Sequence, residues 1–517
     1  MLAERVVAAR EGLSRSPLLR AGGSLAVARL TATLSAFVAT PVLLAALGPD
    51  RFAVYAIGSG AFLYLSVLDL GFSDRCLLVC SAAVSRGDRE SAARAVRRAV
   101  ASYAVAGLGV VLALATSWQA LSGVLNVPAD LRRESLVLLC LLVLSWFAQK
   151  ATTCAGSLAA LRGRFGRAQV APAWGVAALP LVAAACAVVQ PDLALLGAGQ
   201  LAVTGLVLAA ALLLARQDYA WLSREGGQER PDGESGEVRP APHRGFGLYV
   251  QLSALADIVV FAGDRFLVSA QLGLRGVAGL EVANRPATLV RMVSVAPLPV
   301  LFATMARRGA DAQESLVRRT SAWQAAVTAV CAAALVGASG PLLELWLPGT
   351  IGRDLVLLMQ LLVPAYAVHS LTGIYSSALK ARGLAGPTCA FSLACALLKT
   401  TLFFLLLPTQ GLLAVGWASL VGLSLPSVAF MLLVDRRIGL TRDCAPRLAG
   451  FVLATAAGSL AGARAADLAG SSPVLGLLLG TASACTVAAL AWLFWARLLL
   501  ALRAAAPSTV PDHVEHR

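Results

Sequence analysis

Apolar runs follow one another along almost the whole chain, separated by short breaks rich in charge, glycine or proline. About 20 apolar residues cross a hydrocarbon core of roughly 30 Å, so each run is long enough for one transmembrane helix. Barrel strands would instead alternate polar and apolar residues. We therefore predict about fourteen transmembrane helices, over residues 21–47, 53–83, 99–119, 135–160, 169–189, 193–215, 247–271, 283–305, 322–346, 355–379, 387–408, 411–434, 447–466 and 473–497.

Four pairs of segments recur in the same order about 220 residues apart, each at an equivalent loop between predicted spans. The pairs are ALGPDRFAVYAI from Ala46 with QLGLRGVAGLEV from Gln271, SRGDRESAARAVRR from Ser85 with RRGADAQESLVRR from Arg307, NVPADLRRESLVLL from Asn126 with LPGTIGRDLVLL from Leu347, and ALRGRF from Ala160 with ALKARG from Ala378. Generic arginine-rich loops could explain the second and fourth pairs, but they explain all four poorly. We therefore predict an internal duplication.

The duplication determines the predicted architecture. Each repeat crosses the membrane six times, so the two halves have the same orientation and meet at a cleft that can open to either side. The fold class is then an all-α polytopic membrane protein, with two parallel six-helix bundles around a central cavity and two extra C-terminal helices. The predicted segments are 1–20 (cytoplasmic N-terminal segment), 21–215 (first bundle), 216–246 (cytoplasmic polar linker), 247–434 (second bundle), 447–497 (helices 13 and 14) and 498–517 (cytoplasmic tail).

Basic residues gather in alternate loops. The chain has 43 Lys and Arg against 28 Asp and Glu, a formal net charge of +15. About 30 basic residues fall in one set of loops and about 7 in the other, and loops rich in Lys and Arg stay in the cytoplasm. We therefore expect a multi-pass protein of the inner (cytoplasmic) membrane with both termini cytoplasmic. The charge has this topological origin, so no nucleic-acid partner is expected.

Composition excludes several other classes. Hydrophobic residues make up 58% of the chain and charged residues only 14%, which is too apolar for soluble domains. No GxxxxGK[ST] motif occurs, so transport by the chain's own ATP hydrolysis is not expected. Ten cysteines without a CxxC, beside four histidines, are expected to be small apolar residues, with no metal and no cofactor.

Several ionisable residues lie within the predicted spans, where each costs about 2.5 to 3.5 kcal/mol at mid-bilayer. Those near mid-depth are Lys150, Asp257, His369 and Lys399; shallower ones are Arg29, Asp69 and Arg291; those near enough to a span end to reach the interface are Arg75, Asp264, Arg265 and Glu344. Lys150 and His369 occupy nearly corresponding positions of the two repeats, which suggests a shared central cleft.

A cleft lined by Arg29, Lys150, Arg291 and Lys399 would favour an anion, and phosphate is the anion that suits arginine and lysine. Asp69 and Asp257 could carry a coupling proton or sodium ion. They could equally pair with a neighbouring cation to reduce the insertion cost. The sequence leaves both possibilities open.

Three motifs resemble the polysaccharide flippases, the O-antigen and lipid-linked oligosaccharide exporters of the multidrug/oligosaccharidyl-lipid/polysaccharide exporter superfamily. They are LGPDRFAVYAIGSGAFLYLSVLDLGFSD at Leu47–Asp74, DIVVFAGDRFLVSAQLGLRGVAGLEVANR at Asp257–Arg285 and LELWLPG at Leu343–Gly349. The resemblance extends from about Arg20 to Arg497. Correspondence at single residues is secure only for Asp264 and Arg265. We therefore add Arg265 to the cationic set and Asp264 to the ion-coupling or charge-balancing set. His369 belongs to the latter set because it is ionisable and lies near mid-depth.

The resemblance implies a flippase that moves polyprenyl-pyrophosphate-linked oligosaccharide across the inner membrane for surface polysaccharide such as lipopolysaccharide, coupled to an ion gradient and without covalent chemistry. The expected partners are this substrate, the bilayer and a polysaccharide polymerase, with the chain a monomer.

A drug antiporter of the same superfamily is the alternative, although such antiporters usually have twelve spans. A membrane glycosyltransferase or ligase would need an acidic catalytic pair or a nucleophile in an outer loop, for which Asp130, Glu281 and Asp354 are the candidates.

Overall fold

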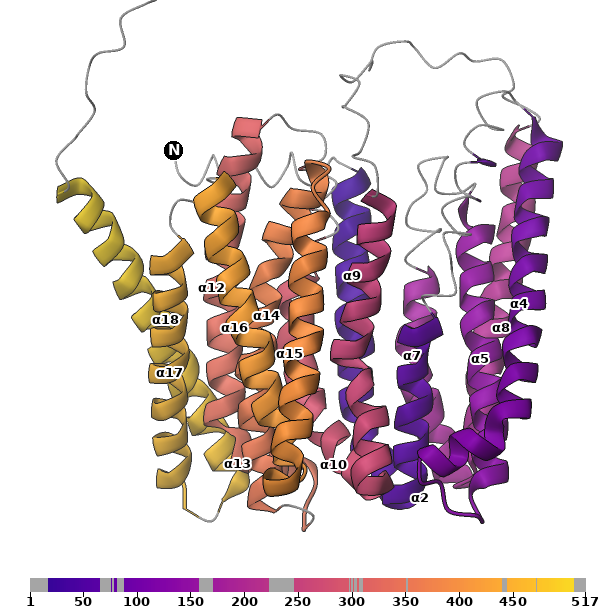
Figure 1. Cartoon of the computed structure of the whole chain (residues 1–517), viewed down its shortest axis with the longest axis horizontal. Coiled ribbons are helices and arrows are strands. Elements are labelled where there is room, and N and C mark those ends of the chain that lie inside the picture. Colours follow the sequence, from indigo (N-terminus) through magenta and orange to yellow (C-terminus); the bar gives the residue numbers. More distant parts are fainter. Residues whose placement is uncertain are drawn as a thin grey trace, which may run out of the picture. The chain divides into compact units, whose positions relative to one another are not determined.

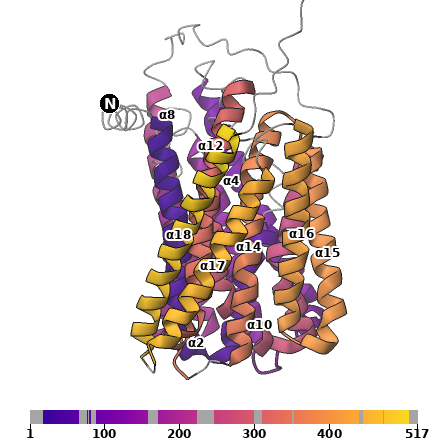
Figure 2. The same ribbon diagram turned by 90° about the vertical axis from the view of Figure 1, so that its left-hand side faces the viewer.

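The computed structural model of the chain describes residues 17–65, 76, 79–80, 88–157, 171–222, 246–296, 298, 301, 305, 310–349, 352–438, 444–470 and 472–505. All regular structure in these residues is helical (Figures 1 and 2). The helices are α2 Pro17–Leu65, α4 Arg89–Val124, α5 Arg132–Ala155, α7 Ala171–Val189, α8 Leu193–Leu222, α9 Phe246–Phe261, α10 Gly263–Val295, α12 Ala310–Gly337, α13 Ser339–Trp346, α14 Arg353–Ala381, α15 Gly386–Gln410, α16 Leu413–Ile438, α17 Cys444–Leu468 and α18 Pro473–Ala505.

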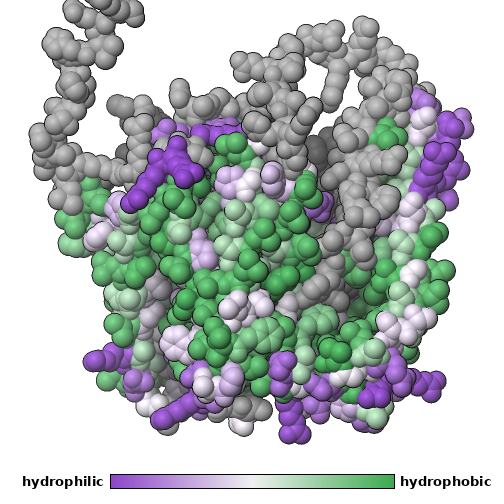
Figure 3. Space-filling view, in the orientation of Figure 1, coloured by the Kyte–Doolittle hydropathy of each residue, from purple (hydrophilic) through white to green (hydrophobic). Residues whose placement is uncertain are grey.

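The helices confirm the predicted fold class. Within the described residues, eleven helices are long and apolar enough to cross a membrane. The surface in Figure 3 is hydrophobic over the middle of the helices and hydrophilic towards their ends. Large apolar side chains are exposed along α4 and α18, among them Leu108, Leu112, Leu490 and Phe494. Such exposure is unfavourable in water and favourable in lipid, so the chain is an all-α polytopic membrane protein.

Two helices contain a sharp kink at a glycine. Gly48 in α2 has φ 73° and ψ 170°, and Gly273 in α10 has φ 73° and ψ −177°. Only glycine adopts this conformation readily, since it has no Cβ. The two glycines are aligned in the first repeat pair of the sequence, and each follows a leucine. The same backbone conformation at aligned positions supports the predicted duplication, whereas the predicted domain boundaries stay a prediction.

The predicted seventh span, 247–271, is discontinuous. Helix α9 ends at Phe261, Ala262 interrupts the helix with φ −113°, and α10 begins at Gly263. The main-chain nitrogen of Arg265 donates to the carbonyl of Ala262, which is an i to i+3 bond of a tight turn. The carbonyl groups that end α9 therefore lie next to the first residues of α10.

The chain forms two compact units. The first comprises residues 1–313 and 352–427, and the second comprises 314–351 and 428–517. In the first, α2 packs on α7 and α10, α5 on α4 and α8, α10 on α14, and α15 on α9. In the second, α17 and α18 pack along each other (Figures 1 and 2), and small side chains at Ala333, Ala484 and Ala488 form a buried contact.

Candidate functional site

Charged side chains gather inside the first unit, on α9, α10, α14 and α15. The cations are Arg265, Arg285, Arg291 and Lys399, the carboxylates are Asp257, Asp264 and Glu281, and His369 lies among them. We refer to these eight residues as the charged cluster. Four cations against three carboxylates leave one formal positive charge when His369 is neutral.

Glu281 lies between two arginines at the centre of the charged cluster. Its side chain is 0% exposed, and its two carboxylate oxygens pair with Arg265 and with Arg285, the latter at 3.2 Å. In a straight helix Arg265 and Glu281 would be about 24 Å apart along the axis. The kink at Gly273 folds α10 back, so that residues on its two sides meet. The Arg265 guanidinium also lies against Gly60 of α2, where a Cβ atom would come within 2.6 Å of it.

Lys399 of α15 forms the second buried ion pair. Its Nζ lies 2.7 Å from Oδ2 of Asp264 and also donates to the carbonyl oxygen of Val260, the penultimate residue of α9. The side chains of Lys399 and Asp264 are only 4% and 10% exposed. The ammonium group therefore lies at the break between α9 and α10 and is shielded from bulk water.

Arg291 differs from the other three cations. Its guanidinium lies over the ring of Phe261, 3.7 Å from the ring centroid, and its side chain is half-buried. Asp257 attracts it electrostatically, but the Asp257 carboxylate is hydrogen-bonded to the Ser392 hydroxyl. Among the described residues, Arg291 forms no hydrogen bond or ion pair. Its N–H groups are thus available to an acceptor other than the described residues of the chain.

His369 of α14 is held by aromatic rings. Its ring stacks on Phe391 at 5.5 Å and meets the edge of Phe261 at 5.2 Å, and its Nδ1 lies 3.5 Å from the Ser427 hydroxyl. Tyr366, one turn away, packs edge-on against Phe261. The imidazole thus contacts aromatic rings and a hydroxyl, and the Arg291 and Lys399 cations act on it electrostatically, which suits a neutral ring.

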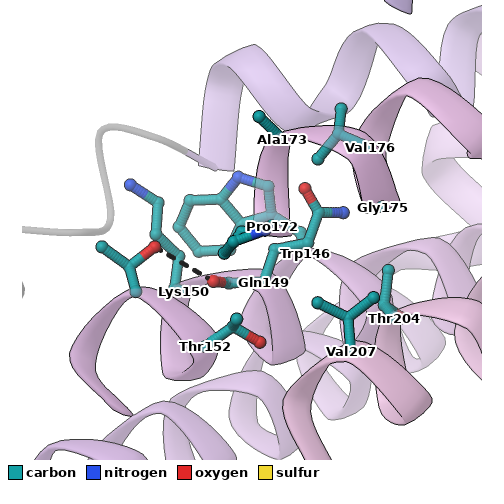
Figure 4. A pocket seen from close by; sticks show the side chains of 11 residues that line it. Trp146, Gln149, Lys150, Thr152, Pro172, Ala173, Gly175, Val176, Thr204 and Val207 are labelled. Atoms are coloured by element: carbon teal, nitrogen blue, oxygen red, sulfur yellow. Dashed lines mark hydrogen bonds between the residues drawn. The ribbon is translucent and has the colours of Figure 1, made fainter. Parts of the chain in front are cut away.

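Lys150 lies in a separate pocket of about 190 Å³ between α5, α7 and α8. Its Nζ is 5.2 Å from the centroid of the Trp146 ring. Figure 4 shows the two side chains beside each other at the pocket. The Gln149 side chain extends into this pocket, where its buried Nε2 has no hydrogen-bond acceptor among the described residues. No residue of the charged cluster lines the pocket, so the structure does not bring Lys150 together with His369.

Two other predicted site residues are exposed. Arg29 is exposed on α2, and Glu344 is exposed on α13 of the second unit. Asp69 and Arg75 fall outside the residues that the structure describes.

Two expectations for acidic and basic residues were wrong. Asp264 and Arg265 do not reach towards an interface, because each is paired with an opposite charge inside the unit. Glu281 is not in an outer loop, because α10 resumes directly after Gly273 and buries it. The i, i+4 spacing of Glu281 and Arg285 is the sequence signal that could have identified this helix and its ion pair.

No protein-family model and no curated protein matches the sequence. Three solved structures have a similar fold. A multidrug resistance MATE family transporter of the MOP superfamily, inward-facing, is 13% identical over 80% of this chain and 98% of its own, with a TM-score of 0.61. Lipid II flippase MurJ, in an inward closed conformation, is 11% identical over 94% and 100%, with a TM-score of 0.58. The MATE multidrug transporter DinF-BH is 15% identical over 82% and 96%, with a TM-score of 0.56.

These likenesses show the fold. The superfamily that the sequence motifs indicated, and its polysaccharide branch, stay predictions. The chain has the polytopic helical fold shared by these MATE transporters and MurJ.

Proposed function

We propose that the chain is a transporter that moves an anionic, lipid-linked sugar across the inner membrane, with a polyprenyl-pyrophosphate-linked oligosaccharide as its substrate. It works by alternating access between the two faces of the membrane, draws on an ion gradient, and makes no covalent bond. Both termini are in the cytoplasm, where the substrate is collected for surface polysaccharide synthesis.

The half-buried guanidinium of Arg291 carries this proposal. Three of the four cations in the charged cluster are already paired with Asp264 or Glu281. Arg291 is oriented by the Phe261 ring and keeps its N–H groups without acceptors among the described residues. Guanidinium groups bind phosphate oxygens through two parallel hydrogen bonds, and such bonds are stronger where water is scarce. A diphosphate is therefore the substrate group that Arg291 would serve.

The proposal is tested in proteoliposomes that contain a labelled polyprenyl-pyrophosphate sugar. Arg291→Gln should slow translocation by about tenfold to a hundredfold, the loss expected for one or two hydrogen bonds to a charged group. Arg275→Gln is the matched control, because Arg275 is an exposed arginine on the same helix. If the two variants transport at the same rate as the wild-type protein, Arg291 is not the diphosphate site.

A drug antiporter is the second candidate, since two of the similar structures are multidrug transporters. Asp257, half-buried on α9, is the carboxylate that would bind a cationic compound. This function predicts efflux of cationic dyes that is lost in Asp257→Asn. The charged cluster opposes it, because the cluster already carries one excess positive charge and would repel a cation.

A sugar-transferring enzyme receives no support from the acidic residues named for it. Glu281 is fully buried between two arginines and cannot reach a substrate outside the membrane. Asp130 and Asp354 are exposed, but among the described residues no basic side chain forms an ion pair with either of them.

A further inference from the structure

The break between α9 and α10 presents oxygen atoms to a positive charge. The last carbonyl groups of a helix have no intrahelical donor, and they give the helix end a partial negative charge. At the end of α9 the carbonyl oxygen of Val260 points to the same place as Oδ2 of Asp264. In transporters built from discontinuous helices, carbonyl and carboxylate oxygens at such a break are ligands for a small monovalent cation.

In this chain the cation at the break between α9 and α10 is a side chain of the protein itself. The Lys399 ammonium lies within 2.5 Å of the Val260 oxygen and 2.7 Å of Asp264 Oδ2. Lys399 is 3% exposed and Asp264 8% exposed, so neither group can exchange its partner for water in this conformation. An ammonium is a compact point charge with three donors. It therefore needs nearby oxygen atoms, as a small dehydrated cation does.

We propose that the helix break between α9 and α10 is a monovalent-cation site, and that Lys399 fills it as a tethered cation. A free Na⁺ is then excluded, because it would have to enter beside the ammonium at a distance where like charges repel strongly. Removal of the Lys399 charge leaves Asp264 buried without a partner and converts the location into a site for Na⁺. For the transporter function proposed above, on which this consequence rests, no sodium gradient acts through this site.

Charge balance over the whole cluster leads to the same conclusion. With Lys399 in place the cluster has four cations and three carboxylates. The other cations near Asp264 are already engaged, since Arg265 and Arg285 share Glu281 and Arg291 lies over Phe261. None of them can take over the Asp264 carboxylate without breaking its own contact. A bound Na⁺ in place of the lysine would restore the original charge.

The test measures cation binding and needs no transport substrate, so it can fail independently of the proposed function. Purified protein is melted in buffers of equal ionic strength that contain either Na⁺ or N-methyl-D-glucamine. The wild-type melting temperature should be the same in both buffers. Lys399→Ala should melt lower, and Na⁺ should raise its melting temperature by a few °C in a saturable manner.

Three variants control this result. Lys399→Ala with Asp264→Asn should lose the response to Na⁺, because the carboxylate is gone. Lys399→Arg keeps a tethered cation and should not respond. Cys395→Ala removes a buried side chain one turn earlier on α15 and should melt lower without a response to Na⁺.

Two results would overturn the inference. One is a Lys399→Ala protein that folds and is indifferent to Na⁺, which would mean that Asp264 takes up a proton instead. The other is a wild-type protein that Na⁺ stabilises in a saturable manner, with the effect lost in Asp264→Asn. If Lys399→Ala does not fold, Lys399→Met, which keeps the length of the side chain, replaces it, and the wild-type measurement decides in either case.

Discussion

Glu281 is the residue on which the two arginines nearest to it depend. A carboxylate without exposed surface is stable only when opposite charges and hydrogen bonds replace its hydration. Arg265 reaches it across the kink in α10, and Arg285 reaches it from the next turn of the same helix. Glu281 therefore fixes both arginines and joins the two parts of α10.

Glu281→Gln should destabilise the protein strongly. Glutamine keeps the size of the side chain but leaves Arg265 and Arg285 without a counter-charge, and loss of one partner from a buried ion pair costs about 3 to 5 kcal/mol. The measurement is the melting temperature of the purified protein in detergent. Glu90→Gln is the control, since Glu90 and Arg94 form a pair on the surface of α4 with side chains 77% and 50% exposed. Equal melting temperatures for the two variants would contradict this role of Glu281.

At the residue scale, hydropathy and depth predicted part of the charged cluster. Asp257, Arg291, His369 and Lys399 were found because each is ionisable within an apolar run, and the structure places all four together. The partners of the cations were not predicted. Ion pairs such as Lys399 with Asp264 join residues that are 135 positions apart, and nothing in a local pattern specifies such a pairing.

At the scale of elements, the kink in α10 and the loop before α5 act together. Asn126 donates from its side-chain amide to the carbonyl oxygens of Ser269 and Ala270 at 2.9 and 3.0 Å. In return the Ser269 hydroxyl donates to the carbonyl of Leu125. These carbonyls lie in the last turn before Gly273, where a helix end needs donors from elsewhere. The loop between α4 and α5 thus caps the first part of α10.

The two kink glycines should respond alike to substitution. Gly48→Ala and Gly273→Ala place a side chain in a conformation that is nearly restricted to glycine, at a cost of about 1 to 3 kcal/mol. No atom lies within 4 Å of the added Cβ at either position, so the cost comes from the backbone alone. We expect both variants to melt at a lower temperature than the wild-type protein.

Gly109→Ala is the matched control for the kink variants. Gly109 lies inside α4, also with no atom within 4 Å of an added Cβ, and its backbone is helical. Alanine is favoured over glycine there by about 1 kcal/mol, so this variant should melt at the same temperature or higher. If Gly48→Ala or Gly273→Ala behaved like Gly109→Ala, the shared kink would not be a constraint of the fold.

Element types could be predicted from the sequence, and their connections less well. Wherever the structure describes the predicted spans, they are helical apart from a few turn residues. The loops expected after residues 47 and 271 are instead kinks within α2 and α10, because a single glycine turns the chain without a polar segment. The break at Ala262 was missed, since an isolated glycine such as Gly263 is tolerated in a helix and does not by itself predict an end.

At the scale of the whole molecule, hydropathy and the repeat were enough to predict the fold class. Apolar runs must form helices in lipid because the backbone has no other partner there, so the sequence constrains the secondary structure more strongly than in a soluble protein. Substrate class has no comparable constraint. It depends on which cations lack carboxylate partners, and that information comes from the tertiary structure of the charged cluster.

We propose that this fold moves an anionic lipid-linked sugar. The purified protein is placed in liposomes that contain both a labelled polyprenyl-pyrophosphate sugar and a cationic dye. The distribution of the sugar between the two leaflets and the gradient of the dye across the membrane are then measured in the same sample. We predict that the sugar redistributes between the leaflets while the dye gradient persists. A dye gradient that collapses in an Asp257-dependent manner, with the sugar still in its original leaflet, would contradict the account and favour the drug antiporter.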